Sequence, residues 1–182
     1  MIWFTADTHF NHTRILQACH RPFKDVDEQN ETIINTWNSV VKNGDEVFHL
    51  GDFGWPGKKQ HQDIGLIISR LNGSIFLIEG NHDREVMGRY RDKFVKVCQT
   101  YNLKRECAPV NIFLCHYSMQ VWNKSHWNSW HLFGHSHGQL DGVGKSFDVG
   151  VDANNFTPIS IDEVTKRMKD LPNNINFIEG AK

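Results

Sequence analysis

Side chains that can bind metal ions follow five short apolar segments of the sequence. Each segment is followed at once by Asp, His or Asn, and in three cases a Gly comes directly before the first of these. Gly permits a sharp turn and a close backbone approach. One such loop would be an ordinary polar strand end. Five loops with the same chemistry indicate a common site, formed by Asp7, His9, Asp52, Asn81, His82, His116, His135 and His137.

The donor types predict a pair of metal ions. Carboxylate, amide and imidazole groups are ligands of mixed oxygen and nitrogen type. In Asp7-Thr8-His9 and His135-Ser136-His137 the two donors are spaced i, i+2, so an extended chain would project each pair toward one centre. The predicted ligands are too many for one tetrahedral ion but suit two ions that share a carboxylate. They are Asp7, His9, Asp52, Asn81, His116, His135 and His137.

Electrostatics adds a bridging group and a substrate preference. Two dications roughly 4 Å apart repel by about 17 kcal/mol at an effective dielectric of about 20. A bridging carboxylate and a bridging hydroxide must offset this repulsion, and Asp52, alone after its Gly, is the expected carboxylate bridge. Asp7, Asp52 and a hydroxide neutralise three of the four positive charges. The charge that remains favours a phosphate oxyanion over a neutral substrate.

Strands and helices must position these residues. Strand-length apolar runs occupy 2–6, 47–50, 74–79, 111–115 and 130–133. Helical spacing covers about 27–42, 61–71 and 160–170, the last with a Ser160 N-cap and Glu163 in the capping-box position. Residues 92–107 are expected to form a hairpin or meander. Strands alternate with helices early and crowd together later, which predicts an α/β layered fold with its site at the carboxyl ends of the strands.

Bulk properties are those of a soluble globular protein. A length of 182 residues with 39% hydrophobic content predicts one domain over residues 1–182. A net charge of −1 does not indicate nucleic-acid binding over a broad basic surface. The cysteines have the spacing of reduced thiols, no apolar run approaches the roughly 18 residues of a membrane span, and no signal peptide begins the chain. We expect a cytoplasmic protein with no membrane partner and with reduced Cys19, Cys98, Cys107 and Cys115.

The motifs together resemble the calcineurin-like metallophosphoesterase superfamily. Asp7-x-His9, Gly51-Asp52, Gly80-Asn81-His82-Asp83, His116 and Gly134-His135-x-His137 occur in order, and every element of the family pattern is present. The sequence around them, including 20–23 and 116–138, resembles a small bacterial and phage-associated branch of predicted phosphoesterases. The resemblance implies two packed mixed β-sheets flanked by helices, in a four-layer sandwich.

The resemblance also implies specific roles. The first metal would be held by Asp7, His9, Asp52 and His137, and the second by Asp52, Asn81, His116 and His135. His82 would be the acid-base residue that assists the leaving group while a metal-bound hydroxide attacks phosphorus. The expected cofactors are two divalent ions, manganese first, with iron, zinc, cobalt or nickel as alternatives. The expected substrate is a phosphodiester or phosphomonoester, either a small molecule or a nucleotide.

Other residues near the motifs have open roles. His12, Arg21 and Arg84 are candidates for a substrate contact because cationic side chains suit phosphate, with a surface or ion-pair role as the alternative. Asp83 either orients its neighbours or caps a turn. Tryptophans in a polar loop either stack on a base or fix the loop: Trp122, Trp127 and Trp130. Ordinary structural roles are expected for His126, His131, Asp148 and Asp152.

Two further function classes remain open. A non-catalytic protein-binding scaffold with the same fold would typically lose ligands or the acid-base histidine, whereas this sequence retains all of them. A small nuclease is the second alternative, although the near-neutral charge gives no sign of an added nucleic-acid-binding segment.

Overall fold

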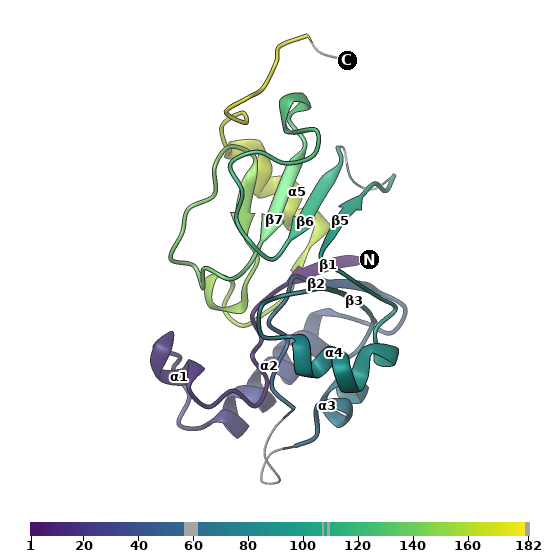
Figure 1. Ribbon diagram of the computed structural model, residues 1–182, viewed down its shortest axis with the longest axis vertical. Helices are drawn as coiled ribbons and strands as arrows, with labels where there is room; N and C mark the ends of the chain where they lie inside the picture. The colour runs from purple at the N-terminus through teal and green to yellow at the C-terminus, as the bar shows by residue number, and fades with distance from the viewer. Residues whose placement is uncertain (57–61, 107, 109, 181–182) are drawn as a thin grey trace.

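Two mixed β-sheets form the centre of the protein (Figure 1). The computed structural model describes residues 1–56, 62–106, 108 and 110–180. The first sheet has the order β4-β3-β2-β1-β9, with β1 (Ile2–Thr5), β2 (Glu46–His49), β3 (Ser74–Ile78), β4 (Lys96–Cys98) and β9 (Ile159–Ser160). The second has the order β5-β6-β7-β8, with β5 (Thr100–Leu103), β6 (Ile112–Cys115), β7 (Trp130–Phe133) and β8 (Ser146–Asp148). The predicted α/β fold class is confirmed.

The strands that lead into the predicted site run parallel within each sheet. In the first sheet β1 pairs with β2, β2 with β3 and β3 with β4 in parallel register, while β9 joins β1 antiparallel. In the second sheet β6, β7 and β8 are parallel and β5 is antiparallel. A parallel bridge between Ala6 and Gly150 lies just beyond β1 and β8 and connects the two halves. The carboxyl ends of both sets of strands therefore meet at one edge.

Helices cover the first sheet on the face away from the second sheet. These are α2 (Val26–Val40), α3 (Ile64–Arg70) and α4 (Arg84–Tyr90), seen below the sheet in Figure 1; the short α1 (Ile15–Ala18) lies to one side. Alternate strand residues such as Val47 and Leu77 pack against Ile33 and Trp37 of α2. The apolar residues whose spacing predicted this helix, including Ile33 and Trp37, form the face of α2 that is buried against the sheet. Its first turn is capped by Asp25, whose carboxylate accepts from the N–H of Glu28.

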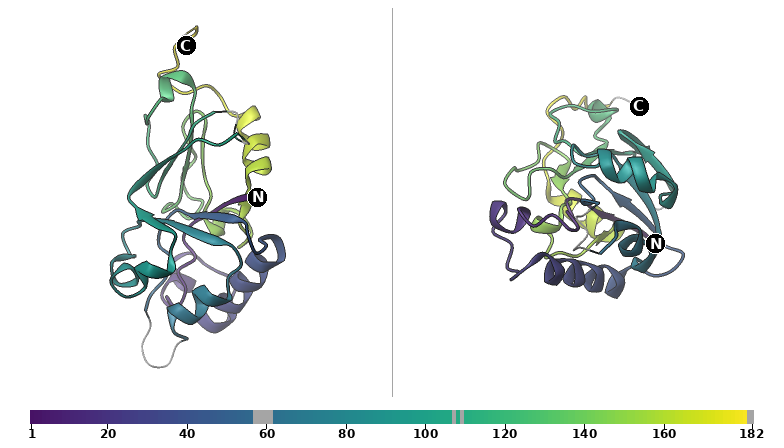
Figure 2. Two further views of the ribbon diagram at one scale, coloured as in Figure 1. Left: turned by 90° about the vertical axis from the view of Figure 1, so that its right-hand side faces the viewer. Right: turned by 60° about the horizontal axis from the view of Figure 1, so that its bottom comes forward.

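The opposite face of the first sheet packs against the second sheet. Phe4 and Phe48 belong to the same buried cluster as Leu114 and Leu132 of the second sheet. Helix α5 (Ile161–Asp170) adds Val164 to this core and lies along the second sheet in Figure 2. Ser160 caps α5 by accepting from the N–H of Glu163, as predicted. On the other face of the second sheet, Trp122 of the loop after β6 packs on Phe113 and Cys115.

The prediction of a hairpin or meander within 92–107 is wrong. β4 pairs with β3 in the first sheet, whereas β5 pairs with β6 in the second, and Gln99 alone separates them. Each strand finds a partner at a sheet edge, and one residue is too short a loop for the two to pair together.

The second predicted helix begins at Ile64 after an Asp63 N-cap, and residue 61, where it was expected to start, lies outside the described residues. Among the described helices, all are too short or too polar to cross a membrane.

Candidate metal centre

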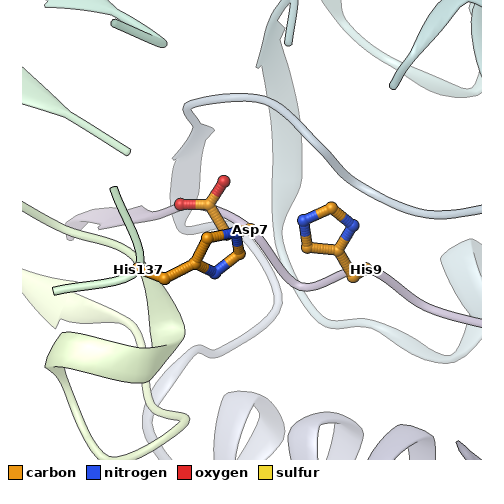
Figure 3. Close-up of side chains that lie close together, drawn as sticks. All are labelled: Asp7, His9 and His137. Carbon is orange, nitrogen blue, oxygen red and sulfur yellow. The ribbon is translucent and has the colours of Figure 1, made fainter. Parts of the chain in front are cut away.

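The ends of β1 and β7 bring together a first group of metal-binding side chains. Candidate ligand atoms of Asp7, His9 and His137 all lie within 4.8 Å of one another. Figure 3 shows that Asp7 and His9 come from the segment after β1, whereas His137 comes from the second half of the chain. The turn is fixed by backbone hydrogen bonds, because the N–H of Asp7 donates to Gly51 at 2.9 Å and that of His9 donates to Asp52 at 3.0 Å.

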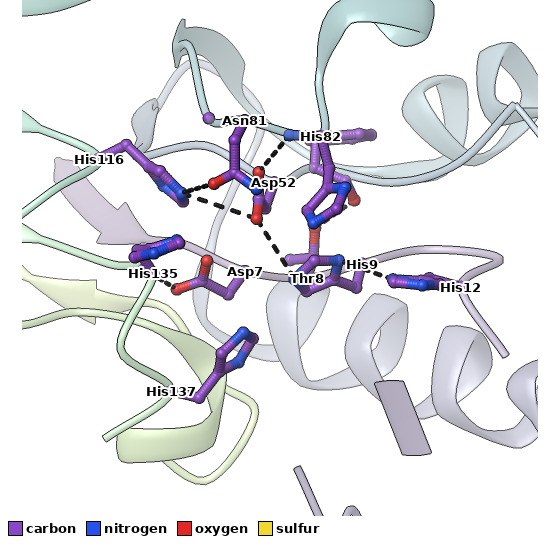
Figure 4. A network of polar contacts seen from close by, with 12 residues as sticks. Asp7, Thr8, His9, His12, Asp52, Asn81, His82, His116, His135 and His137 are labelled. Atoms are coloured by element: carbon purple, nitrogen blue, oxygen red, sulfur yellow. Dashed lines mark hydrogen bonds and ion pairs between the residues drawn. The ribbon is translucent and has the colours of Figure 1, made fainter. Parts of the chain in front are cut away.

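A second group lies beside the first, and Asp52 stands between them. Asp52, His116 and His135 also place ligand atoms within 4.8 Å of one another. Asp52 Oδ2 is 3.6 Å from His9 Nε2 of the first group and 3.6 Å from His116 Nε2 of the second. Asn81 Oδ1 lies 3.1 Å from His116 Nε2. Figure 4 shows the arrangement, with His116 and His135 on one side of Asp52 and His9 on the other.

An extended backbone was expected at the i, i+2 ligand pairs, but the backbone at these residues is not extended. Five predicted ligands have φ between 48° and 65°, a region that non-glycine residues rarely adopt: Asp7, His9, Asp52, His135 and His137. For Asp7 and His9 the outcome is the expected shared centre. For His135 and His137 it is different, because the two imidazoles belong to different groups. Clustered strain of this kind persists where the surrounding structure enforces it, which is typical of functional sites.

Glycines allow the strand ends to approach one another, as predicted. A Cβ on Gly51 would lie 2.6 Å from His116 Nδ1, and one on Gly134 would lie 2.6 Å from Asp7 Oδ2. A Cβ on Gly80 would overlap the carboxylate and the backbone nitrogen of Asp52. Each of these glycines therefore makes room for a predicted ligand of a neighbouring loop.

Unpaired buried atoms test whether a cation fits here. Asp7 Oδ1 and His9 Nε2 are buried and have no hydrogen-bond partner among the described residues. Burial, together with the charges of Asp148 and Asp52, raises the pKa of Asp7 well above its usual value. Burial and the positive charge of Arg21 lower the pKa of His9 well below its usual value, which favours the neutral, ligating form. The anionic form of Asp7 is therefore unfavourable without a nearby positive charge, and a bound cation would stabilise this carboxylate and accept the lone pair of His9.

Hydrogen bonds on the far side of the imidazoles fix which nitrogen faces the centre. His116 Nδ1 lies 2.7 Å from the carbonyl oxygen of Leu50, so this nitrogen carries the proton and donates. His137 Nδ1 donates in the same way to Asp152 Oδ2 at 2.7 Å. In each ring the Nε2 lone pair is therefore left for a ligand. A backbone carbonyl or carboxylate behind a histidine is the usual arrangement in metal sites.

A model of the calcineurin-like phosphoesterase family matches residues 1–152. The chain belongs to this family. The match covers every predicted ligand and the acid-base candidate His82. Because the family consists of metal-dependent phosphoesterases that act on phosphate esters, membership supports the predicted hydrolase class and the fit of the donor set to divalent metal ions.

Two relatives of this family member and one solved structure of similar fold can be compared with it. "Uncharacterized protein MJ1445" of Methanocaldococcus jannaschii is 31% identical over 172 residues, covering 91% of this chain and 89% of that protein. "Gene 66 protein" of Mycobacterium phage L5 is 39% identical over 82 residues, 44% of this chain and 39% of that protein, in agreement with the expected phage association. The crystal structure of a protein of unknown function, AQ665 from Aquifex aeolicus, aligns with a TM-score of 0.74 at 24% identity, covering 92% and 98% of the two chains.

The acid-base candidate of this phosphoesterase family member lies at the mouth of the centre. The backbone N–H of His82 donates to Asp52 Oδ1 at 2.9 Å, which ties the residue to the carboxylate that is predicted to bridge the two ions. Its ring lies 5.7 Å from that of His9 and 5.8 Å from that of His12, between centroids. His12 Nδ1 is 3.1 Å from His9 Nδ1, so His12 supports the orientation of a predicted ligand. Its predicted substrate contact stays a prediction.

The substrate contact predicted for Arg21 requires correction. Arg21 is buried and all five of its N–H groups have protein partners. Nε and Nη2 bind both carboxylate oxygens of Asp152 at 2.8 Å, Nη2 also donates to the carbonyl of Asp7, and Nη1 donates to Thr8 and Gln29. No donor remains for a phosphate. Arg21 instead orients the first loop and, through Asp152, His137.

Three aspartates that sequence reasoning treated as structural or left open support the site. Asp152 holds His137, and although burial raises its pKa, hydrogen bonds from His137 and Arg21 keep that pKa below its usual value. Asp148 accepts from Ser136 and from the backbone of the same loop. Asp83 accepts from the backbone N–H groups of Asp52, Phe53 and Gly80 at 2.8 Å, so its open role is settled as orienting two ligand loops. β8 is a sixth strand end at this edge, and extending the strand-end rule to it would have found Asp148 and Asp152.

The remaining candidates divide between surface and core. Arg84 is exposed at the start of α4, and its predicted substrate contact stays a prediction. Trp122 is buried and fixes the loop, because its indole N–H donates to Ser129. Trp130 is buried in the core between the sheets, whereas Trp127 is exposed and has the Lys124 ammonium over its ring. His131 is fully buried in the second sheet, as expected for a core histidine.

Proposed function

We propose that the chain is a two-metal phosphoesterase that hydrolyses a phosphodiester or phosphomonoester. One observation carries the proposal: two groups of ligand atoms meet at Asp52, and the buried donors Asp7 Oδ1 and His9 Nε2 have no partner in the described part of the chain. Unpaired donors of this kind are costly unless a cation is bound, so their retention supports a metal-binding role.

The protein's own residues divide the work. Asp7, His9 and His137 would hold one ion, Asn81, His116 and His135 the other, and Asp52 both. When bound, the ions supply positive charge to the phosphoryl oxygens and make water a stronger acid. His82 is tied to Asp52 through its backbone, and its ring has no hydrogen bond within the described part of the chain, so it is placed to give a proton to the leaving alkoxide. We propose manganese as the first ion to test, with iron, zinc, cobalt and nickel as alternatives.

A comparison of leaving groups tests the role of His82. Metal-loaded protein is assayed on aryl monoesters and diesters, cyclic nucleotides and short oligonucleotides, with Mn²⁺ and with chelator. His82→Ala should slow esters with an alkoxide leaving group by about 10²–10⁴-fold, the usual contribution of a general acid. The hydrolysis rate of a p-nitrophenyl ester should fall much less in His82→Ala, because p-nitrophenolate departs without a proton.

Two further variants complete the experiment. Asp52→Asn should abolish hydrolysis of all the esters, because it weakens both ion sites. His126→Ala is the matched control, since His126 is a half-buried histidine of the 117–129 segment that contacts Trp127. Near-parental rates in both His82→Ala and Asp52→Asn would contradict the proposal. Metal binding without hydrolysis of any ester would favour the protein-binding scaffold instead.

A further inference from the structure

An exposed tryptophan lies beside the candidate centre and has no role in the scheme above. Trp55 follows β2 and the Asp52 loop, and 39% of its surface is exposed. Its ring is stacked on His12, with 5.5 Å between centroids and 27° between planes, and lies 5.9 Å from the ring of His82. Figure 4 shows His12 and His82 at the same side of the centre.

The backbone holds Trp55 in place. Its N–H donates to the carbonyl of Phe10 at 2.7 Å, and its own carbonyl accepts from the side chain of Asn11 at 3.3 Å. Asn11 is fixed in turn by Asn30 of α2, whose side-chain NH₂ donates to Asn11 Oδ1 at 2.8 Å. Hydrogen bonds therefore fix the backbone that carries the indole, so less ordering entropy would be lost when a flat ligand stacks on it.

The surroundings of Trp55 differ from those of tryptophans that stabilise the core. Trp37, Trp122 and Trp130 belong to buried clusters, with exposed fractions of 8% or less. Trp55 contacts the two histidines at the mouth of the centre and leaves a large part of its ring in water. An exposed, pre-positioned aromatic ring beside a phosphoesterase centre suits the π-face of a nucleobase.

We propose that Trp55, backed by His12, determines substrate choice by stacking on a nucleobase attached to the scissile phosphate. This inference rests on the proposed function and specifies its substrate class. Because Trp55 neighbours His82, which would protonate the leaving alkoxide, the stacked base belongs to the leaving nucleoside. The substrate is then a nucleoside phosphodiester, bound through one base beside the centre and without a broad basic surface.

Matched substrates with and without that base test the proposal. Mn²⁺-loaded protein is assayed on a dinucleotide and on the same phosphodiester with an abasic tetrahydrofuran residue on the leaving side. Stacking on one base corresponds to a factor of about 5–150 in affinity. Trp55→Ala should therefore raise KM for the dinucleotide at least about fivefold, leave the abasic substrate unchanged, and be largely rescued in Trp55→Phe.

Trp127→Ala is the control, because Trp127 has a similar exposure of 44% but contacts His126 and Lys124 instead of the centre. Trp127→Ala should leave KM unchanged for both the dinucleotide and the abasic substrate. An equal loss on both substrates in Trp55→Ala would assign Trp55 a purely structural role, and an unchanged KM for the dinucleotide would also overturn the proposal.

A binding measurement separates this inference from the proposed function. In Zn²⁺-loaded protein, a nucleoside 5′-monophosphate should quench tryptophan fluorescence in the parent and not in Trp55→Phe, whereas ribose 5-phosphate should quench neither. If the parent hydrolyses no ester yet shows this quenching, the hydrolase proposal fails and base stacking stands. If the parent protein hydrolyses the dinucleotide and its abasic counterpart equally and shows no quenching, the stacking proposal fails and the hydrolase proposal stands.

Discussion

Asp152 illustrates, at the scale of single residues, how the candidate ligands are held from behind. It accepts from His137 and forms two hydrogen bonds with Arg21, which also grips the carbonyl of Asp7. Two loops of the candidate first ion site are thus joined through the guanidinium of Arg21. Ligands held in this way bind metal more tightly than freely rotating ones, because their orientation is fixed in advance.

Asp152→Asn should therefore weaken metal binding without altering a ligand. Loss of the carboxylate charge removes half of the Arg21 ion pair and weakens the hydrogen bond from His137. We expect affinity for the first ion to fall about 10–100-fold, measured by competition with a chromophoric chelator. Glu163→Gln, which disrupts only the exposed ion pair with Arg167, is the control. Equal affinity in Asp152→Asn and the parent would mean that Asp152 does not orient His137.

His131 predicts a pH dependence of stability that is separate from the metal centre. Burial lowers its pKa from 6.5 to about 4, although the carbonyls of Phe113 and Tyr117 act in the opposite direction. The unfolded chain therefore binds this proton more readily, so stability is lost as the pH falls from about 6.5 toward 4. Between about pH 7 and pH 5 the parent should lose about 2 kcal/mol more than His131→Gln in urea unfolding. Parallel pH profiles of the two proteins would contradict this.

Residue type and position at strand ends were sufficient to find the candidate ligands. Asp7 and His116 follow apolar runs directly, and the sequence displays that fact. The role of Arg21 was hidden, because its partners are the carbonyls of Thr8 and Asp7 and a carboxylate 131 residues away. Backbone acceptors carry no sequence signal, and a pairing over that distance requires the fold.

At the scale of elements, glycines set how closely the strand ends approach. Gly80→Ala would place a Cβ against Asp52, so we expect stability to fall by about 1–3 kcal/mol and metal affinity to drop. Gly88, in the middle of α4, has open space around its Cβ position. Gly88→Ala should stabilise the protein by about 0.5–1 kcal/mol and leave metal binding unchanged. Urea unfolding and chelator competition on both variants check this, and similar behaviour of the two would show that the close approach at Gly80 is unimportant.

Elements with a strong apolar periodicity or a clear cap could be predicted from the sequence, whereas the pairing of strands within the sheets could not. Helix α2 followed from the spacing of Ile33, Ile34 and Trp37, and α5 from its Ser160 cap. The segment 92–107, which contains β4 and β5, was predicted as a hairpin or meander. Their assignment to different sheets depends on which edges β3 and β6 leave free, and that information is not local.

At the scale of the whole molecule, buried negative charge makes folding stability depend on metal. Asp7, Asp52 and Asp148 are all buried around the centre. A metal concentration about 100-fold above Kd should stabilise the fold by about 2.7 kcal/mol and raise Tm by about 5–10 °C. Asp7→Asn should raise Tm of the metal-free protein, because it removes a carboxyl whose charged form is disfavoured by burial and by repulsion from Asp148 and Asp52, and should reduce the shift on adding Mn²⁺. Thermal unfolding with Mn²⁺ and with chelator measures both effects. If Tm of the parent protein is the same with Mn²⁺ and with chelator, the result would argue against a metal centre.

The long sequence separation of the candidate ligands also constrains synthesis in the cell. The carboxylate of Asp7 accepts from the backbone of His135, 128 residues further on, and Arg21 meets Asp152 across 131 residues. A growing polypeptide therefore cannot assemble the candidate first ion site in this form until residues up to Asp152 have left the ribosome. We expect metal binding at this site to come late in synthesis, and a nascent chain stalled before that point should bind no ion there.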